Sequence, residues 1–155
     1  MTGKQTSHVT VSYTNGRSDI TRTYAVNEDI LQELDRHKQN PTGKDLQSWL
    51  ENKGCRLDSA DGPAFARSTT DGSTHEVHYR AGKMHRENGP AVVRRDPDGT
   101  VVEEYYRDGK RHREDGPAIF TRFANGSIRE LYYRDGKTLP SHFSLPNPWR
   151  LSAYA

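Results

Sequence analysis

One short phrase of sequence returns along the chain at a fixed interval, and this repeat limits the folds that the chain can adopt. The motif Asp/Asn-Gly-Pro-Ala begins at Asp61, Asn88 and Asp115, and both intervals are 27 residues. A period of that length indicates equal units stacked side by side, because one such unit cannot bury an apolar face alone. The sequence therefore predicts an array of three units in residues 61–137.

Turn signals recur at matching places in the units, and they predict β-hairpins. Asp-Gly and Asn-Gly favour tight hairpin turns because Gly and Asn tolerate a positive φ. Such pairs lie within Thr69–Ser73, Asp96–Thr100 and Phe123–Ser127. A further turn, Arg-Ala/Asp-Gly-Lys, begins at Arg80, Arg107 and Arg134. The residues between these turns alternate with the period of two that half-buried strands require. We therefore expect each unit to be two strands joined by a tight turn.

The alternation assigns two kinds of side chain to the two faces of the expected sheet. One face carries tyrosines in register, at Tyr79, Tyr106 and Tyr133. Val77 and Leu131 share this face, whereas the equivalent residue in the middle unit is Glu104. The other face carries a band of Glu, His or Tyr, and Arg. The band consists of Glu76, His78, Arg80, Glu103, Tyr105, Arg107, Glu130, Tyr132 and Arg134. Glu and Arg on one face can pair across strands, at roughly 0.2–1 kcal/mol for each pair.

The stretch from Arg107 to Lys137 resembles a MORN repeat. That family's pattern places an aromatic residue before Asn/Asp-Gly-Lys, then a histidine, a glycine and a strand–turn–strand segment. The matching positions are Tyr106, Gly109, Lys110, His112, Gly116, Gly126, Tyr133 and Gly136, and, one unit earlier, Tyr79, Gly82, Lys83, His85, Gly89 and Gly99. The period here is longer than the family's, and its His-Gly-x-Gly becomes His-Arg-x-x-Gly-Pro-Ala. The chain is also similar to bacterial MORN-like proteins described as antitoxins. The resemblance covers about half of the chain, and it implies a hairpin array.

The segment before the units, residues 1–60, begins with a hairpin pattern and a first helical pattern. Apolar residues alternate on both sides of Asn15-Gly16, at Val9, Val11, Tyr13, Ile20, Tyr24 and Val26. Asn27 can then cap a helix, because its side chain accepts a backbone hydrogen bond and the acidic Glu28 and Asp29 follow in the first turn.

A second helix can begin at Thr42 or Asp45 and end at Gly54, which suits the residue after a helix C-terminus. Its apolar side chains are Leu46, Trp49 and Leu50. Two short helices with one apolar face each must bury that face. We expect them to cover the open edge of the first unit, so that residues 1–60 form a hairpin with a two-helix cap.

The last segment, residues 138–155, is rich in proline and cannot be a regular strand or helix throughout. It contains Pro140, Pro146 and Pro148, together with the apolar residues Phe143, Leu145, Trp149, Leu151 and Tyr154. We expect it to pack on the last unit, and the alternative is that it inserts into a partner as an extended peptide. The predicted fold class is thus mainly β with a small α part, an antiparallel β-hairpin repeat array with two short N-terminal helices.

The charge and cysteine content excludes several classes of protein. There are 23 basic and 21 acidic side chains, and they are mixed along the chain. No segment therefore has the concentrated positive charge that binds nucleic acid or an anionic membrane strongly. Cys55 is alone, which excludes an intrachain disulfide and a cysteine metal cluster. No long apolar run is present. We therefore expect a cytoplasmic protein.

Reactive motifs are lacking, so we predict neither an enzyme nor a resident metal or cofactor. His85 and His112 recur with the period, but units about 9–10 Å apart hold them too far from each other to share a zinc ion. Glu103 and Glu104 point to opposite faces of a strand and cannot act as an acid–base pair. Glu76, Glu103 and Glu130 share a face, yet an Arg follows each of them and favours the charged carboxylate over an acid.

The surface is the better candidate for function. Lys83, Lys110 and Lys137 recur in the same turn, and arginines and tyrosines gather around the middle copy. Arg and Tyr are typical anchors of protein interfaces. The candidate partner-binding residues are Tyr105, Arg107, Lys110, Arg111, His112, Arg113, Tyr132, Arg134, Lys137 and Trp149. A solvated face that keeps the array soluble is the alternative interpretation.

The expected function is a non-catalytic module that binds and occludes another protein, such as a small stoichiometric inhibitor of antitoxin-like or phage-borne type. The alternative is a binder of anionic ligands, phospholipid headgroups or nucleic acid, through the Lys/Arg-rich turns. The interspersed acidic residues, among them Asp108, Glu114 and Asp135, favour a protein partner of mixed charge over a polyanion.

Overall fold

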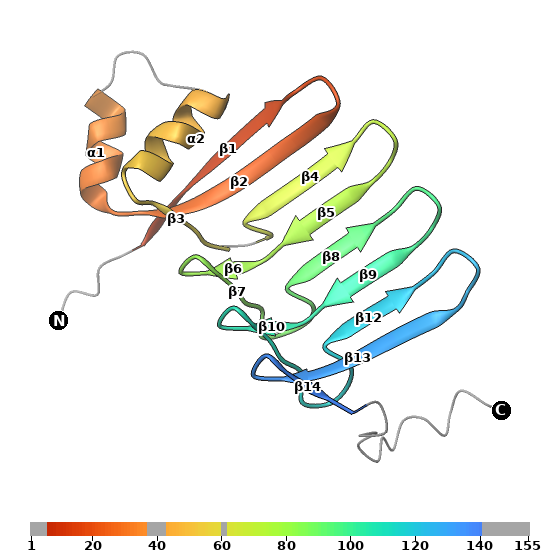
Figure 1. The fold of residues 1–155 in the computed structure, drawn as a ribbon. Helices are drawn as coiled ribbons and strands as arrows, with labels where there is room; N and C mark the ends of the chain where they lie inside the picture. The colour runs from red at the N-terminus through yellow and green to blue at the C-terminus, as the bar shows by residue number, and fades with distance from the viewer. Residues whose placement is uncertain (1–5, 37–42, 60–61, 141–155) are drawn as a thin grey trace.

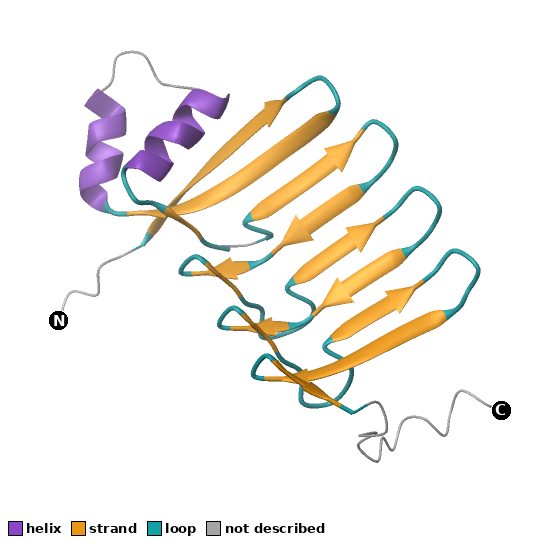
Figure 2. Ribbon diagram, viewed as in Figure 1, coloured by secondary structure: helices purple, strands orange, loops and turns teal. Residues whose placement is uncertain are grey.

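The computed structural model describes residues 6–36, 43–59 and 62–140. In these residues the chain is mainly β, with antiparallel hairpins and two helices, as the sequence predicted (Figure 1, Figure 2). One sheet contains ten strands of the described part, in the order β1-β2-β4-β5-β8-β9-β12-β13-β14, with β3 paired to β2. The long strands therefore follow one another across the sheet in the order in which they occur in the sequence.

Long hairpins lie side by side in one layer (Figure 1). They are formed by β1 (Ser7–Thr14) with β2 (Ser18–Val26), β4 (Phe65–Thr69) with β5 (Thr74–Val77), β8 (Val92–Arg95) with β9 (Val101–Glu104), and β12 (Ile119–Arg122) with β13 (Ile128–Arg134). The register aligns Glu76, Val93, Glu103, Phe120 and Glu130 across five strands. Because opposite residues in an antiparallel pair share a face, the three glutamates lie in one row, as predicted.

The turns of the three later long hairpins use the same chemistry. An Asp or Asn oxygen accepts the backbone N–H two residues further on, from Ser73 to Asp71 at 2.9 Å, from Thr100 to Asp98 at 2.8 Å and from Ser127 to Asn125 at 2.9 Å. The glycine between each pair has a positive φ, of 81° to 91°. Hydrogen bonds from Thr69 and Ser73 lower the pKa of Asp71 to about 2. The turn signals in the sequence are thus explained by local bonding.

Each unit also contains a second, short hairpin, and the expectation of two strands for each unit was incomplete. These hairpins are β6 (Tyr79–Arg80) with β7 (Lys83–Met84), β10 (Tyr106–Arg107) with β11 (Lys110–Arg111), and the end of β13 with β14 (Lys137–Leu139). The strands β5 and β9 stop at Val77 and Glu104, and a short hairpin follows each of them. In the hairpin after β5, both central residues of the turn have a positive φ, 49° at Ala81 and 78° at Gly82. Two positive φ values are what a type I′ hairpin turn requires.

The short strand β3 (Arg56–Leu57) pairs with the end of β2 in the way that β7 pairs with β6. Tyr24 lies opposite Leu57, as Tyr79 lies opposite Met84. Between β2 and β3 the chain forms both described helices, α1 (Glu28–Arg36) and α2 (Gly43–Asn52). The Asn15-Gly16 turn closes a long hairpin, whereas the Gly-Lys turns close the short ones.

The helices begin and end at the predicted signals. The Asn27 side chain accepts the N–H of Ile30 at 3.0 Å, which confirms the N-cap. Gly54 has a φ of 76°, and the N–H groups of Gly54 and Cys55 donate to the carbonyls of Glu51 and Leu50, at 2.9 and 3.0 Å. That pair of bonds is a Schellman motif, which satisfies the last carbonyls of α2.

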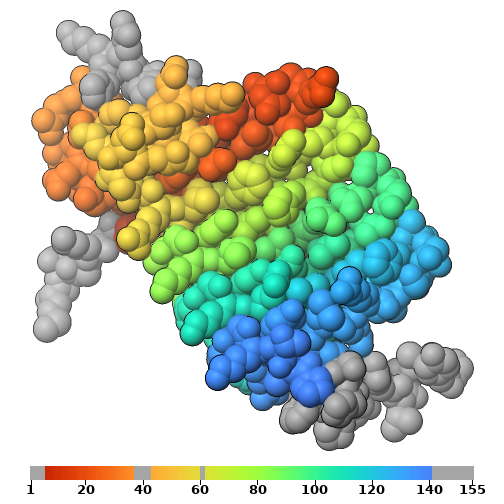
Figure 3. Space-filling view, viewed as in Figure 1, coloured from red at the N-terminus to blue at the C-terminus, as the bar shows by residue number. Residues whose placement is uncertain are grey.

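The apolar core lies between the helices and the first hairpin, where α1 and α2 cover its end of the sheet (Figure 3). Its buried residues are Val11, Tyr24, Val26 and Leu50, and Leu46, Trp49, Ile30 and Leu31 pack against them. Tyr24 donates a hydrogen bond to Glu51 at 2.8 Å, and burial raises the pKa of this tyrosine well above its usual range. Within the described ranges, neither helix has the length and apolar character needed to cross a bilayer.

The alanine of each Gly-Pro-Ala motif is fully buried, at Ala64, Ala91 and Ala118. Its carbonyl accepts the N–H of Thr23, His78 or Tyr105 in the preceding hairpin, at 2.7 to 2.8 Å. A larger side chain would not fit at these positions, so the motif marks where one hairpin follows another. The predictions for the tail, including Trp149, and for a helix start at Thr42 fall outside the described residues.

Candidate protein-binding surface

Two open grooves lie beside the short hairpins, and most residues that line the first have an equivalent in the second at an offset of 27 positions. The first has a volume of about 790 Å³ and the second about 760 Å³. The first is lined in part by Glu76, His78, Arg80, His85 and Arg86, and the second by Tyr105, Arg107, His112, Arg113 and Glu114. Asn88 lines both grooves. The two grooves therefore form one continuous surface with a repeated pattern.

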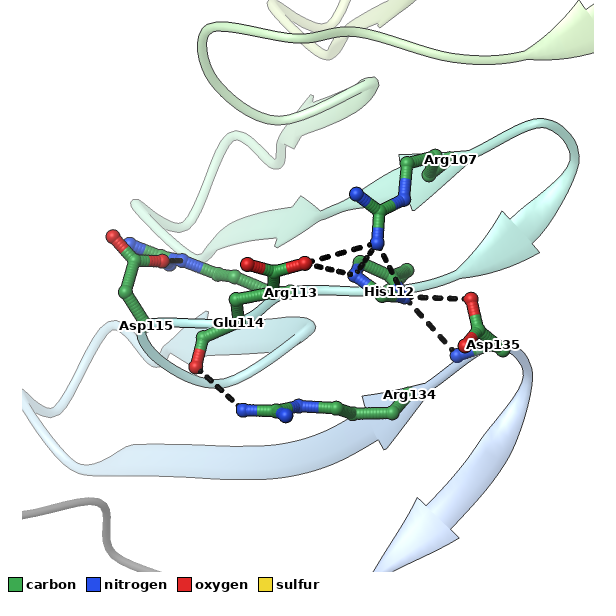
Figure 4. Close-up of polar contacts among 7 residues, drawn as sticks. All are labelled: Arg107, His112, Arg113, Glu114, Asp115, Arg134 and Asp135. Atoms are coloured by element: carbon green, nitrogen blue, oxygen red, sulfur yellow. Dashed lines mark hydrogen bonds and ion pairs between the residues drawn. The ribbon is translucent and has the colours of Figure 1, made fainter.

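Buried histidines connect each unit to the turn of the next. Nδ1 of His85 accepts the backbone N–H of Asp108 at 3.0 Å, and Nδ1 of His112 accepts that of Asp135 at 3.2 Å (Figure 4). Asp58, 27 residues before His85, does the same for Ala81, with an oxygen at 2.7 Å. The role of Asp58 was missed in the sequence, although the period leads to it. In the described ranges, no group of three metal-binding side chains is present.

The repeated arginines bind the loops beside them, and not the glutamate row. Arg80 bonds Glu87 at 3.0 Å and Asp108 at 2.9 Å, while Arg107 bonds Glu114 at 3.0 Å and contacts His112. Arg134 donates to the backbone carbonyl of Glu114 at 2.9 Å (Figure 4). The predicted pairing of Glu and Arg within the band is therefore wrong. The glutamates are used otherwise, since Glu130 accepts the Tyr132 hydroxyl at 3.0 Å.

Arg113 contacts both a tyrosine ring and the Gly-Pro-Ala loop. Its guanidinium lies 4.0 Å from the centre of the Tyr105 ring and donates to Asp115 at 3.1 Å and to the Pro117 carbonyl at 3.4 Å. A Cβ on Gly116 would come within 3.2 Å of it, so a larger residue there would require Arg113 to shift. Burial, with Glu103 and Asp115 nearby, raises the pKa of Tyr105. Arg113 and Tyr105 thus hold the groove wall in place and leave only part of their surface for a partner.

Arg111 lies with the tyrosine row instead of lining a groove. Its Nε and Nη2 are both 3.2 Å from Glu104, and its guanidinium lies 5.8 and 5.5 Å from the ring centres of Tyr106 and Tyr133. The equivalent residues one unit earlier are Val77 and Met84. An ion pair therefore replaces an apolar pair, which explains why Glu104 interrupts the aliphatic series.

The lysines of the short turns have exposed side chains, and the stems of Lys83 and Lys110 pack on the next turn. Lys83, Lys110 and Lys137 are exposed, and none of them forms an ion pair with a described residue. A Cβ built on Gly109 would lie 3.7 Å from Cβ of Lys83, and one on Gly136 would lie 3.8 Å from Cβ of Lys110. Each of these stems therefore packs over the glycine of the following turn.

The predicted site residues that the structure describes are divided among four places, one of which is β13, with Tyr132 and Arg134 outside both grooves. Tyr105, Arg107, His112 and Arg113 line the second groove. Arg111 belongs to the tyrosine row, and Lys110 and Lys137 occupy the outer turns. Among the groove residues that were not predicted as part of the site are Arg86, Glu87, Asn88 and Asp115. They lie in the His-Arg-Glu-Asn/Asp-Gly-Pro loops. The sequence shows the period of these loops, but it does not show that they fold beside the grooves.

Comparison of the chain with protein-family models, with curated proteins and with solved structures gives no match. Its function is therefore inferred from the surface and its chemistry.

Proposed function

We propose that the chain is a non-catalytic module that binds another protein along the two grooves. The observation that carries this proposal is their equivalence, since grooves of about 790 and 760 Å³ present the same kinds of group at a fixed offset. Each offers a half-buried aromatic or imidazole ring, arginines and carboxylates, which is the mixture found at protein interfaces. A surface that repeats suits a partner segment extended across the units.

We further propose that the module is a MORN-like repeat array, capped by α1 and α2. The same bonds recur at each junction, with the N–H groups of Gly82, Gly109 and Gly136 donating to the preceding short hairpin at 2.8 to 2.9 Å. The pairing of β2 with β3 has the same form, so the first hairpin serves as an additional unit whose turn contains the helices. A helix pair that buries the apolar face of this unit ends the array at its N-terminal side.

Such a module acts by occlusion, as a small stoichiometric inhibitor does. Anionic ligands are the second candidate, because exposed cations recur on the short turns. Salt distinguishes the two: binding to a polyanion weakens steeply with ionic strength, and a contact anchored by Tyr and Arg responds much less.

The test uses a substitution that fills the grooves without removing a described bond. Asn88 is exposed and lines both grooves, so Asn88→Tyr should obstruct them. Ala124→Tyr, at the exposed tip of a long hairpin, is the matched control. Proteins that co-purify with the tagged wild-type chain are identified, and their affinity for purified variants is measured by calorimetry. We expect Asn88→Tyr to weaken binding at least about tenfold and Ala124→Tyr to leave it unchanged. Equal affinities in all three proteins would contradict the proposed site.

A further inference from the structure

Four exposed cations occupy equivalent positions along one side of the molecule. They are Arg56, Lys83, Lys110 and Lys137, each 27 residues from the next. Arg56 is in β3, and the lysines begin β7, β11 and β14, which follow one another along the same side of the sheet (Figure 1). We call these four residues the cation row. A binding role for the cation row rests on the proposed protein-binding function, and it concerns the chemistry of the partner.

The positions in the cation row are fixed by the backbone beneath them. The Gly82 N–H donates to the Leu57 carbonyl at 2.9 Å, and the corresponding bonds of Gly109 and Gly136 are 2.8 and 2.9 Å long. The Arg56 stem packs on Gly82 as Lys83 packs on Gly109, since a Cβ on Gly82 would come within 3.1 Å of Arg56 Cδ. The stems of Arg56, Lys83 and Lys110 are therefore held against the next turn, and only the ends of these three side chains are free to move.

Asp108, in one of these turns, already has a cationic partner, and the cations of the row do not. Asp108 bonds Arg80 at 2.9 Å, and this guanidinium lowers the pKa of Asp108. No member of the cation row forms an ion pair within the described part of the chain. The row thus keeps an unbalanced positive charge in a chain whose formal net charge is only +2.

The interval of the row suggests the shape of its ligand. Successive units are two strands apart, and two interstrand distances make roughly 9.6 Å. A polyproline II segment rises about 3.1 Å for each residue and turns once every three residues, so side chains at every third position lie on one side, about 9.3 Å apart. We infer that the cation row docks an extended, acidic segment of the partner protein with Asp or Glu at every third position.

A protein segment fits the row better than a continuous polyanion does. Acidic residues occupy the same turns and loops as the row: Asp108 and Asp135 precede Lys110 and Lys137 by two residues, and Glu87 and Glu114 follow Lys83 and Lys110 by four. A nucleic acid or an anionic membrane would bring negative charge close to these acids as well, whereas a peptide can place neutral residues there. Separated carboxylates at the matching interval meet only the cations, and like-charge contacts are avoided.

The probe is a peptide that tests spacing at constant composition. Twelve-residue peptides of sequence (Glu-Pro-Pro)₄ and Glu₄Pro₈ carry the same charge, and only the first has a carboxylate on each turn. Binding of fluorescent forms to the full chain is followed by anisotropy at low ionic strength. We expect the spaced peptide to bind at least about fivefold more tightly than the block peptide, because it can satisfy the row without crowding its charges.

Variants test whether the row is responsible. Replacement of Lys83, Lys110 and Lys137 by Gln should weaken binding of the spaced peptide about tenfold, since each exposed ion pair contributes modestly. The control replaces Arg17, Arg95 and Arg122 by Gln, which removes the same charge from exposed positions elsewhere. The control should bind as wild type, and circular dichroism should show both variants folded.

The inference would be overturned by equal affinity for the spaced and block peptides, by equal loss in the two triple variants, or by tighter binding of single-stranded DNA or phosphatidylserine vesicles than of the spaced peptide. Failure here leaves the proposed groove function standing, because the Asn88→Tyr test depends on different residues. An effect of Asn88→Tyr on peptide binding as large as that of the lysine variant would also contradict the placement of the peptide on the row.

Discussion

The ion pair between Glu104 and Arg111 should be exchangeable for the apolar pair that the preceding unit uses in its place. The perturbation is a double-mutant cycle of Glu104→Val, Arg111→Met and the two together, which reproduces Val77 and Met84 of the earlier unit. We expect each single variant to be destabilised and the double variant to recover most of the loss.

The magnitude follows from how far the pair is withdrawn from water. The side chains of Glu104 and Arg111 keep 22% and 40% of their surface exposed, so the pair lies between a surface pair and a buried one. Glu104→Val leaves Arg111 on the rings of Tyr106 and Tyr133 without its carboxylate, and Arg111→Met leaves Glu104 with only the Tyr106 hydroxyl, at 2.9 Å. Each single loss should cost about 1–2 kcal/mol of the free energy of unfolding.

The double variant restores an apolar contact and removes both charges, so it should lie within about 1 kcal/mol of wild type. The coupling energy between the two sites, which is the sum of the single losses minus the loss in the double variant, is then about 1–4 kcal/mol. Urea unfolding followed by circular dichroism measures all four proteins. Glu87→Gln is the control, because its pair with Arg80 is 73% and 51% exposed and should contribute less than about 1 kcal/mol. A double variant whose loss equals the sum of the single losses would refute the reasoning.

Three further predictions concern stability. Ala81→Gly should raise the free energy of unfolding by about 0.5–1 kcal/mol in urea, because Ala81 has a φ of 49°; a loss would contradict this account of the turn. His85→Leu should lower it by about 1–3 kcal/mol, because the Asp108 N–H loses its acceptor, and unchanged stability would refute that role. Burial and Arg86 lower the pKa of His78 from 6.5, so the unfolded chain takes up the proton first and stability should fall as the pH drops below about 6.5. His78→Tyr, the residue at the equivalent positions, should reduce this fall between pH 7 and 5 in thermal unfolding, and an unchanged pH profile would count against it.

The sequence was sufficient for features that local bonding decides. The turn motifs, the Asn27 cap and the Gly54 helix end depend on residues within a few positions of one another, and each was found where predicted. The period of two also placed Glu76, Glu103 and Glu130 in one row, because register between neighbouring hairpins follows from the turns.

The features that depend on contact between units were harder to predict. The bend after Val77 cannot be read from alternation, since the same pattern continues unbroken in β13 of the last unit. The targets of Arg80, Arg107 and Arg113 are set by loops that fold beside them, and a same-face rule could not supply these contacts. The Asp58 contact appears only when the period is extended backwards beyond the visible motif.

The way in which α1 and α2 enter the fold shows where this architecture can accept new material. In the other short hairpins the turn between the two strands has only two central residues, such as Ala81 and Gly82. In the first unit the corresponding connection, between Val26 of β2 and Arg56 of β3, contains both helices, and the two strands still pair. Loop closure becomes only slowly less favourable with length, so long additions at such turns are tolerated. The Asp108 and Asp135 turns are therefore natural sites for grafting a peptide or a whole domain onto this scaffold.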